Sequence, residues 1–450
     1  MKIATQRAAG RSLLKAILGL LAVTGGSRVA HSQQKTPKPP VKSSPREKED
    51  PLAPLLQQAK DDIDKSDFAS ALDPLQKYIA QRPDEPYPHF QLGYAFAGLK
   101  RQEDAKAEFS RAIALDPKMP AAYLNLGLVL MEIDPGAAAE AFRRVAELQP
   151  TESRPRFLAG YSLERAGKFT DAIEQYRGAL AISPNEYDIH LALGRALLRT
   201  NDAPGAEEQF RAAVAARAAS SPARLGLANT LLAQKKYDTA SDALAEYLKL
   251  NPGDRPAHFD RASALLNLNR YDDAIAELDR AESGSVPAPE ALKMRGEIDM
   301  RQKKWKESRD VLTRAIQASP KDVEVAAWLG HVDIQLRDYA AASNILQQVY
   351  RQDPQSTEVL RDLANALFLN EDYPAAIEAM DSLAKLESPN AGSWFVRAIC
   401  YDKLSRKVEA IDAYRKFLDL DNEQHDNQDI EARHRMAALQ RELKQEGKKR

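Results

Sequence analysis

The sequence predicts an all-α protein, an α-solenoid of about eleven helical hairpins closed by a C-terminal capping helix. Two observations carry this prediction. An aromatic residue, a proline and an alanine each return along the chain in steps of 34 residues, and self-similarity at such a fixed period is the signature of stacked repeats. Glycine is also scarce, at 20 of 450 residues, while alanine, leucine and glutamate are plentiful, which favours helix over sheet.

The first 32 residues have the pattern of a secretory signal peptide. A basic start without acids, residues 1–15, precedes the apolar run "AILGLLAVTGG", and Ala30 and Ser32 stand as the small residues of a cleavage site before Gln33. The run is shorter than the roughly twenty residues that a membrane span needs. We therefore expect cleavage, an exported protein that is periplasmic or secreted, and no stable membrane span after signal cleavage. An uncleaved N-terminal anchor is the alternative.

Residues 33–50, "QQKTPKPPVKSSPREKED", contain four prolines, many charges and no aromatic ring. A segment of this composition cannot bury enough apolar surface to fold by itself. We expect a disordered, Pro/Lys-rich linker that acts as a spacer.

The repeat then runs from about Leu52 to Asn422, and three series of residues fix its register. The first series is of prolines. The second is of alanines that pack between helices, and Ser308 is its one interruption. The third is of aromatic rings at the expected start of second helices. The prolines are Pro83, Pro117, Pro150, Pro184, Pro252, Pro320 and Pro354. The alanines are Ala71, Ala105, Ala138, Ala172, Ala206, Ala240, Ala274, Ala342, Ala376 and Ala410. The rings are Tyr237, Tyr271, Trp305, Tyr339 and Tyr373, which we expect to be core residues.

One unit, residues 86–117, shows how the hairpin should form. Gly93 lies on the apolar face of a first helix, and Ala105 and Phe109 lie on that of a second, with a break at "GLKRQED". The small residues let the two backbones approach closely. Pro117 ends the second helix because it cannot continue the hydrogen-bond ladder.

The repeats divide into two arrays at the looser connection "AESGSVPAP", residues 281–289. We expect about seven repeats in residues 51–286 and about four in residues 287–422. Residues 423–450 should form a capping helix and a basic tail, and terminal caps are a general need of solenoids. The apolar residues expected on one face of that last helix are Ile430, Met436, Leu439 and Leu443.

The spacing of 34, with a Leu-Gly pair, then an aromatic, then alanine and proline, resembles the tetratricopeptide repeat. The resemblance covers residues 52–422 and is met about eleven times in register. It implies a right-handed superhelix whose concave groove is lined by first helices and binds protein or peptide partners. One departure is the third unit, which lost one residue in its turn at "MEIDPGAAAEA".

The sequence contains no nucleotide-binding, metalloprotease or serine-hydrolase motif, so we predict no enzyme, no cofactor and no metal. A formal net charge of −1 gives no sign of a nucleic-acid partner. His89, His190 and His258 share one position of the first helix, and we expect them to be packing residues. Cys400 should be a small buried hydrophobe.

The resemblance implies which residues of each first helix face the concave groove. The N-terminal half of that surface would be unusually aromatic. Aromatic anchors are typical of partner sites, although some of these rings could equally pack against neighbouring hairpins. The N-terminal candidates are Tyr87, Phe90, Tyr94, Leu124, Leu128, Arg154, Phe157 and Tyr161. The polar candidates further along are Arg195, Asn229, Arg361 and Asn365.

From these observations we predict a non-catalytic scaffold or assembly factor of the cell envelope that binds a protein or peptide in its groove. Two other functions stay open. One is a glycan-handling or polysaccharide-export accessory, in which rings stack on sugars. The other is a regulatory or catalytic activity without a recognisable motif.

Overall fold

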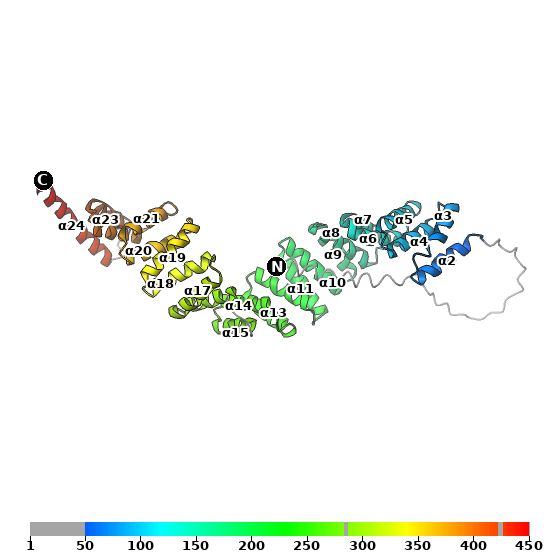
Figure 1. Ribbon diagram of the computed structural model, residues 1–450, viewed down its shortest axis with the longest axis horizontal. Helices are drawn as coiled ribbons and strands as arrows, with labels where there is room; N and C mark the ends of the chain where they lie inside the picture. The colour runs from blue at the N-terminus through cyan, green and yellow to red at the C-terminus, as the bar shows by residue number, and fades with distance from the viewer. Residues whose placement is uncertain (1–49, 283–286, 422–425, 450) are drawn as a thin grey trace, which may run out of the picture. The chain divides into compact units, whose positions relative to one another are not determined.

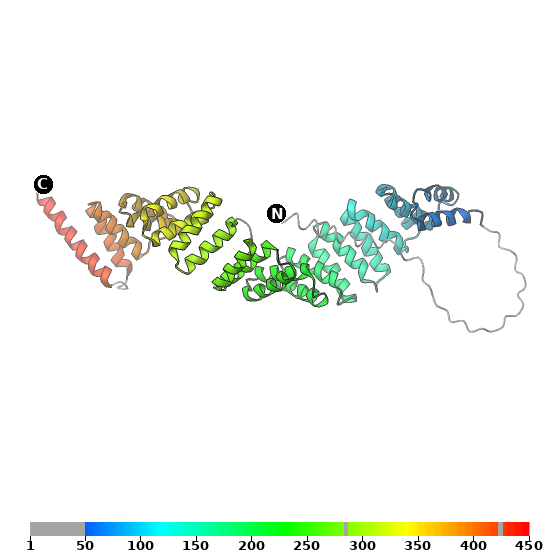
Figure 2. The ribbon, with the colours of Figure 1, turned by 60° about the horizontal axis from the view of Figure 1, so that its bottom comes forward.

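The computed structural model describes residues 50–282, 287–421 and 426–449, and the regular secondary structure within these ranges is helical. Successive helices run side by side in pairs, and each pair packs on the next along the chain (Figures 1 and 2). This is the predicted all-α solenoid. The predicted signal peptide, residues 33–49 of the linker and the centre of the connection at 283–286 lie outside the described residues.

In the part of the chain that the structure describes, eleven helix pairs precede a final helix, in agreement with the predicted count of about eleven repeats. The first helices of the pairs are α2 (Ala53–Asp64), α4 (Pro86–Gly98), α6 (Pro120–Ile133), α8 (Ser153–Arg165), α10 (Tyr187–Arg199), α12 (Ser221–Ala233), α14 (Arg255–Asn267), α16 (Pro289–Arg301), α18 (Val323–Gln335), α20 (Thr357–Leu369) and α22 (Ala391–Lys403). The second helices are α3 (Leu72–Gln81), α5 (Gln102–Leu115), α7 (Pro135–Leu148), α9 (Phe169–Ile182), α11 (Ala203–Ala216), α13 (Tyr237–Leu250), α15 (Tyr271–Glu282), α17 (Trp305–Ala318), α19 (Tyr339–Gln352), α21 (Tyr373–Ala384) and α23 (Lys407–Asp421). The last helix is α24 (Asp426–Lys449).

The alanine series lies at the closest contact within each hairpin. Every alanine from Ala71 to Ala410 in that series is 0% exposed, and so is Ser308, which takes the same place. The buried Ser308 hydroxyl donates to the Gly296 carbonyl oxygen at 3.0 Å, so its polar group is satisfied. Side chains at this contact must be small, and the one polar member is tolerated because it finds an acceptor.

The glycine of the Leu-Gly pair lies on the other side of that contact. A Cβ atom on Gly93 would stand 2.8 Å from the ring of Phe109, and one on Gly127 would stand 2.6 Å from the ring of Phe142. Both rings are fully buried. The glycine therefore makes room for a large ring from the second helix of its own hairpin, whereas the sequence predicted only a close approach of the two backbones.

The recurring rings begin the second helices α13, α15, α17, α19 and α21. All five are half-buried, so the prediction that they are core residues needs correction. Tyr271, Trp305, Tyr339 and Tyr373 pack against the edges of core clusters and leave part of each ring exposed. Each of these five rings stands at the first position of its helix, at the end of the hairpin.

A left-handed residue occupies the turn inside almost every hairpin. In the second hairpin, the Arg101 N–H donates to Phe96 O at 2.9 Å and the Lys100 N–H donates to Ala97 O at 3.0 Å, the pattern of a Schellman motif. Only one residue of this set is glycine. The left-handed residues are Ser66, Lys100, Gly167, Asn201, Lys235, Asn269, Lys303, Arg337, Glu371 and Ser405.

The third hairpin lacks this residue, which accounts for its shorter repeat. Helix α6 ends at Ile133, α7 begins at Pro135, and Asp134 alone joins them. The Asp134 carboxylate accepts from the Ala137 N–H at 3.0 Å and caps the second helix. The predicted loss of one turn residue is confirmed.

Helix α24 packs on α23 through buried Ala432 and Leu439, with Met436 and Leu443 half-buried beside them. Ile430 is 55% exposed, so the prediction that it shares this face was wrong. Asp429, one residue earlier, is buried in its place. The packing face of the helix is therefore rotated from the one that its apolar residues suggested.

Candidate partner-binding face

The aromatic residues of the predicted groove are largely used in packing. Tyr87 on α4 is 48% exposed, whereas Phe90 and Tyr94 on the same helix are half-buried. The ring centroid of Phe90 lies 5.9 Å from that of Phe109 in the second helix of its own hairpin. The ring of Tyr94 lies 6.2 Å from Phe68 in an edge-on contact. Of the three predicted rings on α4, Tyr87 is the exposed one and therefore available to a partner.

Helix α8 repeats this arrangement. Phe157 is half-buried, with its ring 5.9 Å from Tyr176 of α9, and Tyr161 is buried at 8% exposure. Burial raises the pKa of Tyr161. Arg154, at the start of the helix, is exposed, and no hydrogen bond or ion pair joins its side chain to another described residue. Between these two hairpins, Leu124 and Leu128 of α6 are half-buried.

The polar candidates are more open. Asn229 on α12 and Asn365 on α20 are exposed. Arg195 on α10 is half-buried, and its Nε lies 4.0 Å from a Glu164 carboxylate oxygen. Arg361 is exposed and forms a two-point ion pair with Glu387, with 3.0 Å between Nε and Oε1.

Arg361 and Asn365 are the predicted residues that the structure brings together in a cavity. This cavity, about 190 Å³ in volume, lies between α20, α21 and the start of α22. Its apolar lining includes Met380, Leu383 and Val396. A floor of apolar side chains with amide and guanidinium groups at the rim is the usual composition of a ligand pocket.

The sequence-based reasoning missed a series of ion pairs between successive first helices. Lys293 of α16 lies 2.5 Å from Glu324 of α18, and its ammonium is 5.4 Å from the ring of Trp328. His331 of α18 lies 2.9 Å from Asp362 of α20, a hydrogen bond that raises the pKa of His331. Opposite charges 31 residues apart in a repeat of 34 are the signal that would have identified these pairs.

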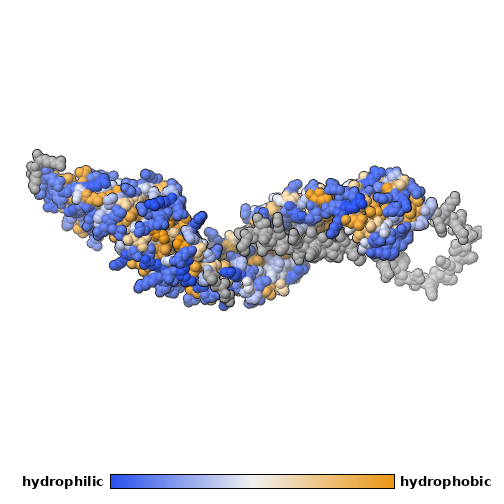
Figure 3. Space-filling model, in the orientation of Figure 1, coloured by the Kyte–Doolittle hydropathy of each residue, from blue (hydrophilic) through white to orange (hydrophobic). Residues whose placement is uncertain are grey.

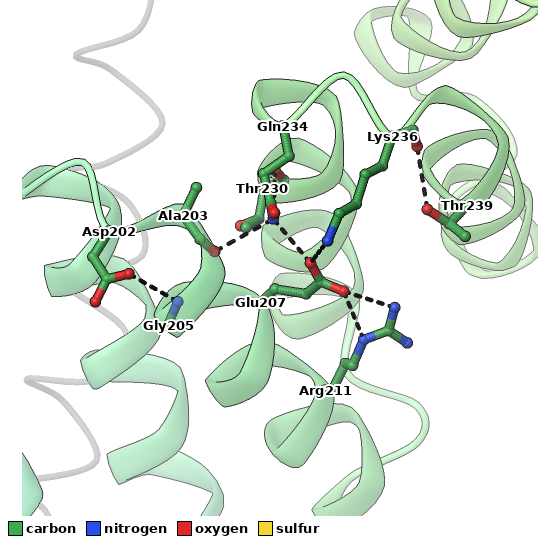
Figure 4. A network of polar contacts seen from close by, with 9 residues as sticks. All are labelled: Asp202, Ala203, Gly205, Glu207, Arg211, Thr230, Gln234, Lys236 and Thr239. Atoms are coloured by element: carbon green, nitrogen blue, oxygen red, sulfur yellow. Dashed lines mark hydrogen bonds and ion pairs between the residues drawn. The ribbon is translucent and has the colours of Figure 1, made fainter.

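A second kind of pair joins a second helix to the turn of the next hairpin. The Glu207 carboxylate of α11 accepts from Lys236 at 2.7 Å, from Gln234 at 2.9 Å and from Arg211 at 2.9 Å (Figure 4). Together, with Lys236 contributing most, these donors lower the pKa of Glu207 to about 2 despite its burial. Glu207 is thus the centre of a bridge between two repeats.

Three repeats later, the two positions equivalent to Glu207 and Lys236 hold residues with the charges exchanged. Arg309 of α17 lies 2.7 Å from Asp338 in the next turn, and Arg309 and Asp338 each stand 102 residues, three times 34, after Glu207 and Lys236. Arg309 also lies 3.0 Å from Asp333, a buried carboxyl whose pKa burial raises to about 6.

The three histidines that share a helix position are structural, as predicted. Nε2 lies within hydrogen-bond distance of a proline carbonyl oxygen in each case, at 3.0 Å for His89, 2.8 Å for His190 and 3.1 Å for His258. Because a carbonyl only accepts, the ring donates there. This contact ties each first helix to the end of the preceding hairpin.

The described residues contain no group of three acidic, histidine or cysteine side chains placed to hold a metal ion. Cys400 is fully buried, and burial raises the pKa of its thiol to about 11, so it is the small apolar residue that we expected. In the same ranges, no helix is both long enough and apolar enough to cross a bilayer. Apolar residues on the face drawn in Figure 3 lie in small groups among hydrophilic ones.

A family model described as Tetratricopeptide repeat matches residues 56–120, 103–153, 134–187, 157–222, 191–255, 225–287, 259–323 and 370–425, and a second one with the same description matches residues 299–349 and 333–394. The chain belongs to the tetratricopeptide repeat family. Tetratricopeptide repeat proteins are generally non-catalytic scaffolds that bind protein partners, and this chain has the repeat scaffold of that family.

Three solved structures illustrate the similarity of this tetratricopeptide repeat chain to known proteins. MamA from Desulfovibrio magneticus RS-1 is 22% identical over 38% of this chain and 96% of its own, with a TM-score of 0.35. A chain of the Naa15/Naa10 complex bound to HypK-THB is 14% identical, and the match covers 86% of this chain and 66% of that one, with a TM-score of 0.45. PilF from Pseudomonas aeruginosa is 19% identical over 48% of this chain and 99% of its own, with a TM-score of 0.35.

Proposed function

We propose that the protein is an exported scaffold or assembly factor of the cell envelope that holds a protein or peptide segment against its first helices. The observation that carries the proposal is the cavity at Arg361 and Asn365, with its apolar floor of Met380, Leu383 and Val396. A bound segment would place one apolar side chain in this cavity. Its backbone would pair with the Asn365 amide, which offers both a donor and an acceptor.

The exposed groups further up the array fit the same role. Tyr87, Arg154 and Asn229 are open on first helices, whereas the other predicted rings hold hairpins together. An extended partner would therefore gain its specificity from a few separated anchors. Such anchors carry most of the binding energy in known interfaces.

The test is affinity capture from an envelope extract, followed by titration of the purified partner segment. The variant Arg361→Ala/Asn365→Ala should weaken binding at least tenfold, because it removes the rim of the cavity. Lys306→Ala/Gln317→Ala is the matched control, since it changes two exposed residues of a second helix. Equal affinities for the wild type and both variants would refute this site.

The assignment to the cell envelope has its own test. N-terminal sequencing of the protein recovered from the host should begin at Gln33. Recovery of the intact N-terminus in a membrane fraction would favour the uncleaved anchor.

Glycan handling is the second candidate because Tyr87 presents an exposed ring that could stack on a sugar. Retention on envelope polysaccharide that Tyr87→Ala abolishes, with no protein captured, would favour it over the protein scaffold.

A further inference from the structure

An arginine replaces the leucine of the Leu-Gly pair in three hairpins and is half-buried in two of them and buried in the third. In most hairpins the position holds an apolar residue, as in Leu92, but α14, α16 and α22 carry Arg261, Arg295 and Arg397 there. Arg397 is 4% exposed. A guanidinium at this depth requires compensation by acids or other acceptors, and the three hairpins supply it differently.

In the α14–α15 hairpin, the compensation is an internal carboxylate. Glu277 of α15 is 1% exposed and accepts hydrogen bonds from Arg261 and Arg280, while its other oxygen lies 2.6 Å from Nδ1 of His258. These four residues line one cleft of about 750 Å³. The Glu277 carboxylate thus lies against two guanidinium groups and an imidazole, and Lys249 and Asp279 also line the cleft.

The α22–α23 hairpin has a cleft lined by the equivalent four positions, with two cations but without that carboxylate. A step of 136 residues, four times 34, leads from His258 to Trp394, from Arg261 to Arg397 and from Arg280 to Lys416. The same step leads from Glu277 to Ala413. Trp394, Arg397, Ala413 and Lys416 line a cleft of about 540 Å³, which we call the Arg397 cleft.

The cations of the Arg397 cleft are only partly compensated. Lys416 Nζ and Arg397 Cζ lie 4.4 Å and 5.3 Å from the Trp394 ring centroid. Arg397 bonds through Nη1 to Asp381 of α21, an acid whose side chain is 55% exposed, and its buried Nε, like that of Arg261, has no partner among the described residues. Lys416 pairs with Asp412 at 2.8 Å.

We propose that the Arg397 cleft binds a carboxylate supplied by another molecule, which takes the place that Glu277 fills in the α14–α15 hairpin. Arg397 and Lys416 would hold the carboxylate, as Arg261 and Arg280 hold that of Glu277.

The lining also indicates what accompanies the carboxylate. Val408, which is 66% exposed, and Ile411 and Leu443 add apolar surface to the cleft. Three cations, Arg397, Arg415 and Lys416, line it against two acids, Glu409 and Asp412, so a single negative charge suits it better than a phosphate dianion. The ligand is therefore a carboxylate with an apolar neighbour, either a free organic acid or a glutamate side chain of a peptide. This inference is independent of the groove proposed above.

The probe is propionate, which reproduces the Glu277 side chain beyond its Cα, with neutral propionamide as the control ligand. Propionate should change the tryptophan fluorescence of the full chain in a saturable way and raise its unfolding midpoint, whereas propionamide should do neither. Arg397→Leu, which restores the usual residue, and Ala413→Glu, which supplies the carboxylate internally, should each weaken propionate binding at least tenfold.

Glu277→Ala provides the positive control because it removes the carboxylate from the equivalent cleft. This variant should be destabilised and partly restored by propionate. The proposal is overturned if the wild type responds equally to propionate and propionamide, or if Arg397→Leu and Ala413→Glu bind propionate as the wild type does. It is also overturned if propionate restores Glu277→Ala but does not bind the Arg397 cleft.

A peptide arm distinguishes the two sources. Acetyl-Ala-Glu-Val-amide carries the carboxylate beside an apolar residue, and its Gln counterpart lacks the charge. Binding at least tenfold tighter than propionate, lost in the Gln peptide, would identify a protein segment as the ligand. Affinity no better than that of propionate would identify a free organic acid.

Discussion

Gly167 is the one glycine among the left-handed turn residues, and its replacement by alanine isolates the energy of that backbone conformation. Its φ is +76°, and a Cβ added there would meet no atom within 4 Å. The left-handed conformation costs an L-residue about 1–2 kcal/mol. Alanine also restricts the unfolded chain, which offsets about 0.4–1 kcal/mol of that cost. Gly167→Ala should therefore lower the local free energy of unfolding by about 1 kcal/mol.

Amide hydrogen exchange is the suitable assay because repeat arrays unfold in parts, and a single global unfolding energy is then poorly defined. A loss of about 1 kcal/mol corresponds to roughly fivefold faster exchange of the protected amides in α8 and α9. Gly253→Ala is the matched control. Its added Cβ also meets nothing within 4 Å, but Gly253 lies outside the left-handed region, so exchange should stay equal or become slower.

The reverse change tests the same reasoning in another hairpin. Lys303 has a φ of +57°, so Lys303→Gly should relieve the strain and slow exchange in α16 and α17. If Gly167→Ala and Gly253→Ala behaved alike, the strain assigned to these turns would be absent and the reasoning refuted.

Three further predictions concern pairs and buried groups. Glu207→Gln should lower the free energy of unfolding by about 1 kcal/mol at neutral pH. A double-mutant cycle with Lys236→Met should show a coupling energy that is present above about pH 4.5. This coupling should be lost as the pH falls towards 2, because the folded-state pKa of Glu207 is depressed. Asp333→Asn should stabilise the protein at pH 7 by about 1–3 kcal/mol in urea unfolding, because the wild-type carboxyl has a raised pKa near 6. Wild-type stability should correspondingly rise as the pH falls from 7 through 6 towards 4, and a parallel pH profile in the Asn variant would contradict this assignment. In thermal unfolding, Ser308→Ala should change the free energy of unfolding by no more than about 1 kcal/mol. The variant removes one hydrogen bond, to Gly296, and otherwise restores the residue found in the other repeats. A larger loss would show that the hydroxyl has a role beyond that bond.

The hairpins could be predicted from sequence because their closest contacts tolerate little variation. A side chain larger than alanine at Ala105, or a Cβ at Gly93, would overlap the facing helix or the Phe109 ring. Such constraints repeat with the structure and therefore leave a visible period in the sequence. The boundaries of the helix pairs follow from that period alone.

The candidate site was less predictable because helix position does not fix where a long side chain ends. Phe90 and Tyr87 both belong to the expected groove set, yet Phe90 reaches back to the second helix while Tyr87 remains open. The prediction of the packing face of the last helix was wrong for a similar reason. The apolar Ile430 lies outside and Asp429 inside, since contacts with α23 set the rotation of the last helix.

The opposed pairs Glu207–Lys236 and Arg309–Asp338 have a consequence for how this gene can change length. A recombination that removed 102 codons, the length of three repeats, would keep the remaining alanines, prolines and rings in register. If the deletion joined the end of α11 to the turn before α19, Asp338 would take the place of Lys236. Two carboxylates, those of Glu207 and Asp338, would then face each other. Repeats that are interchangeable in their packing are thus not interchangeable in their order, and the charges at their borders record which neighbour each one has.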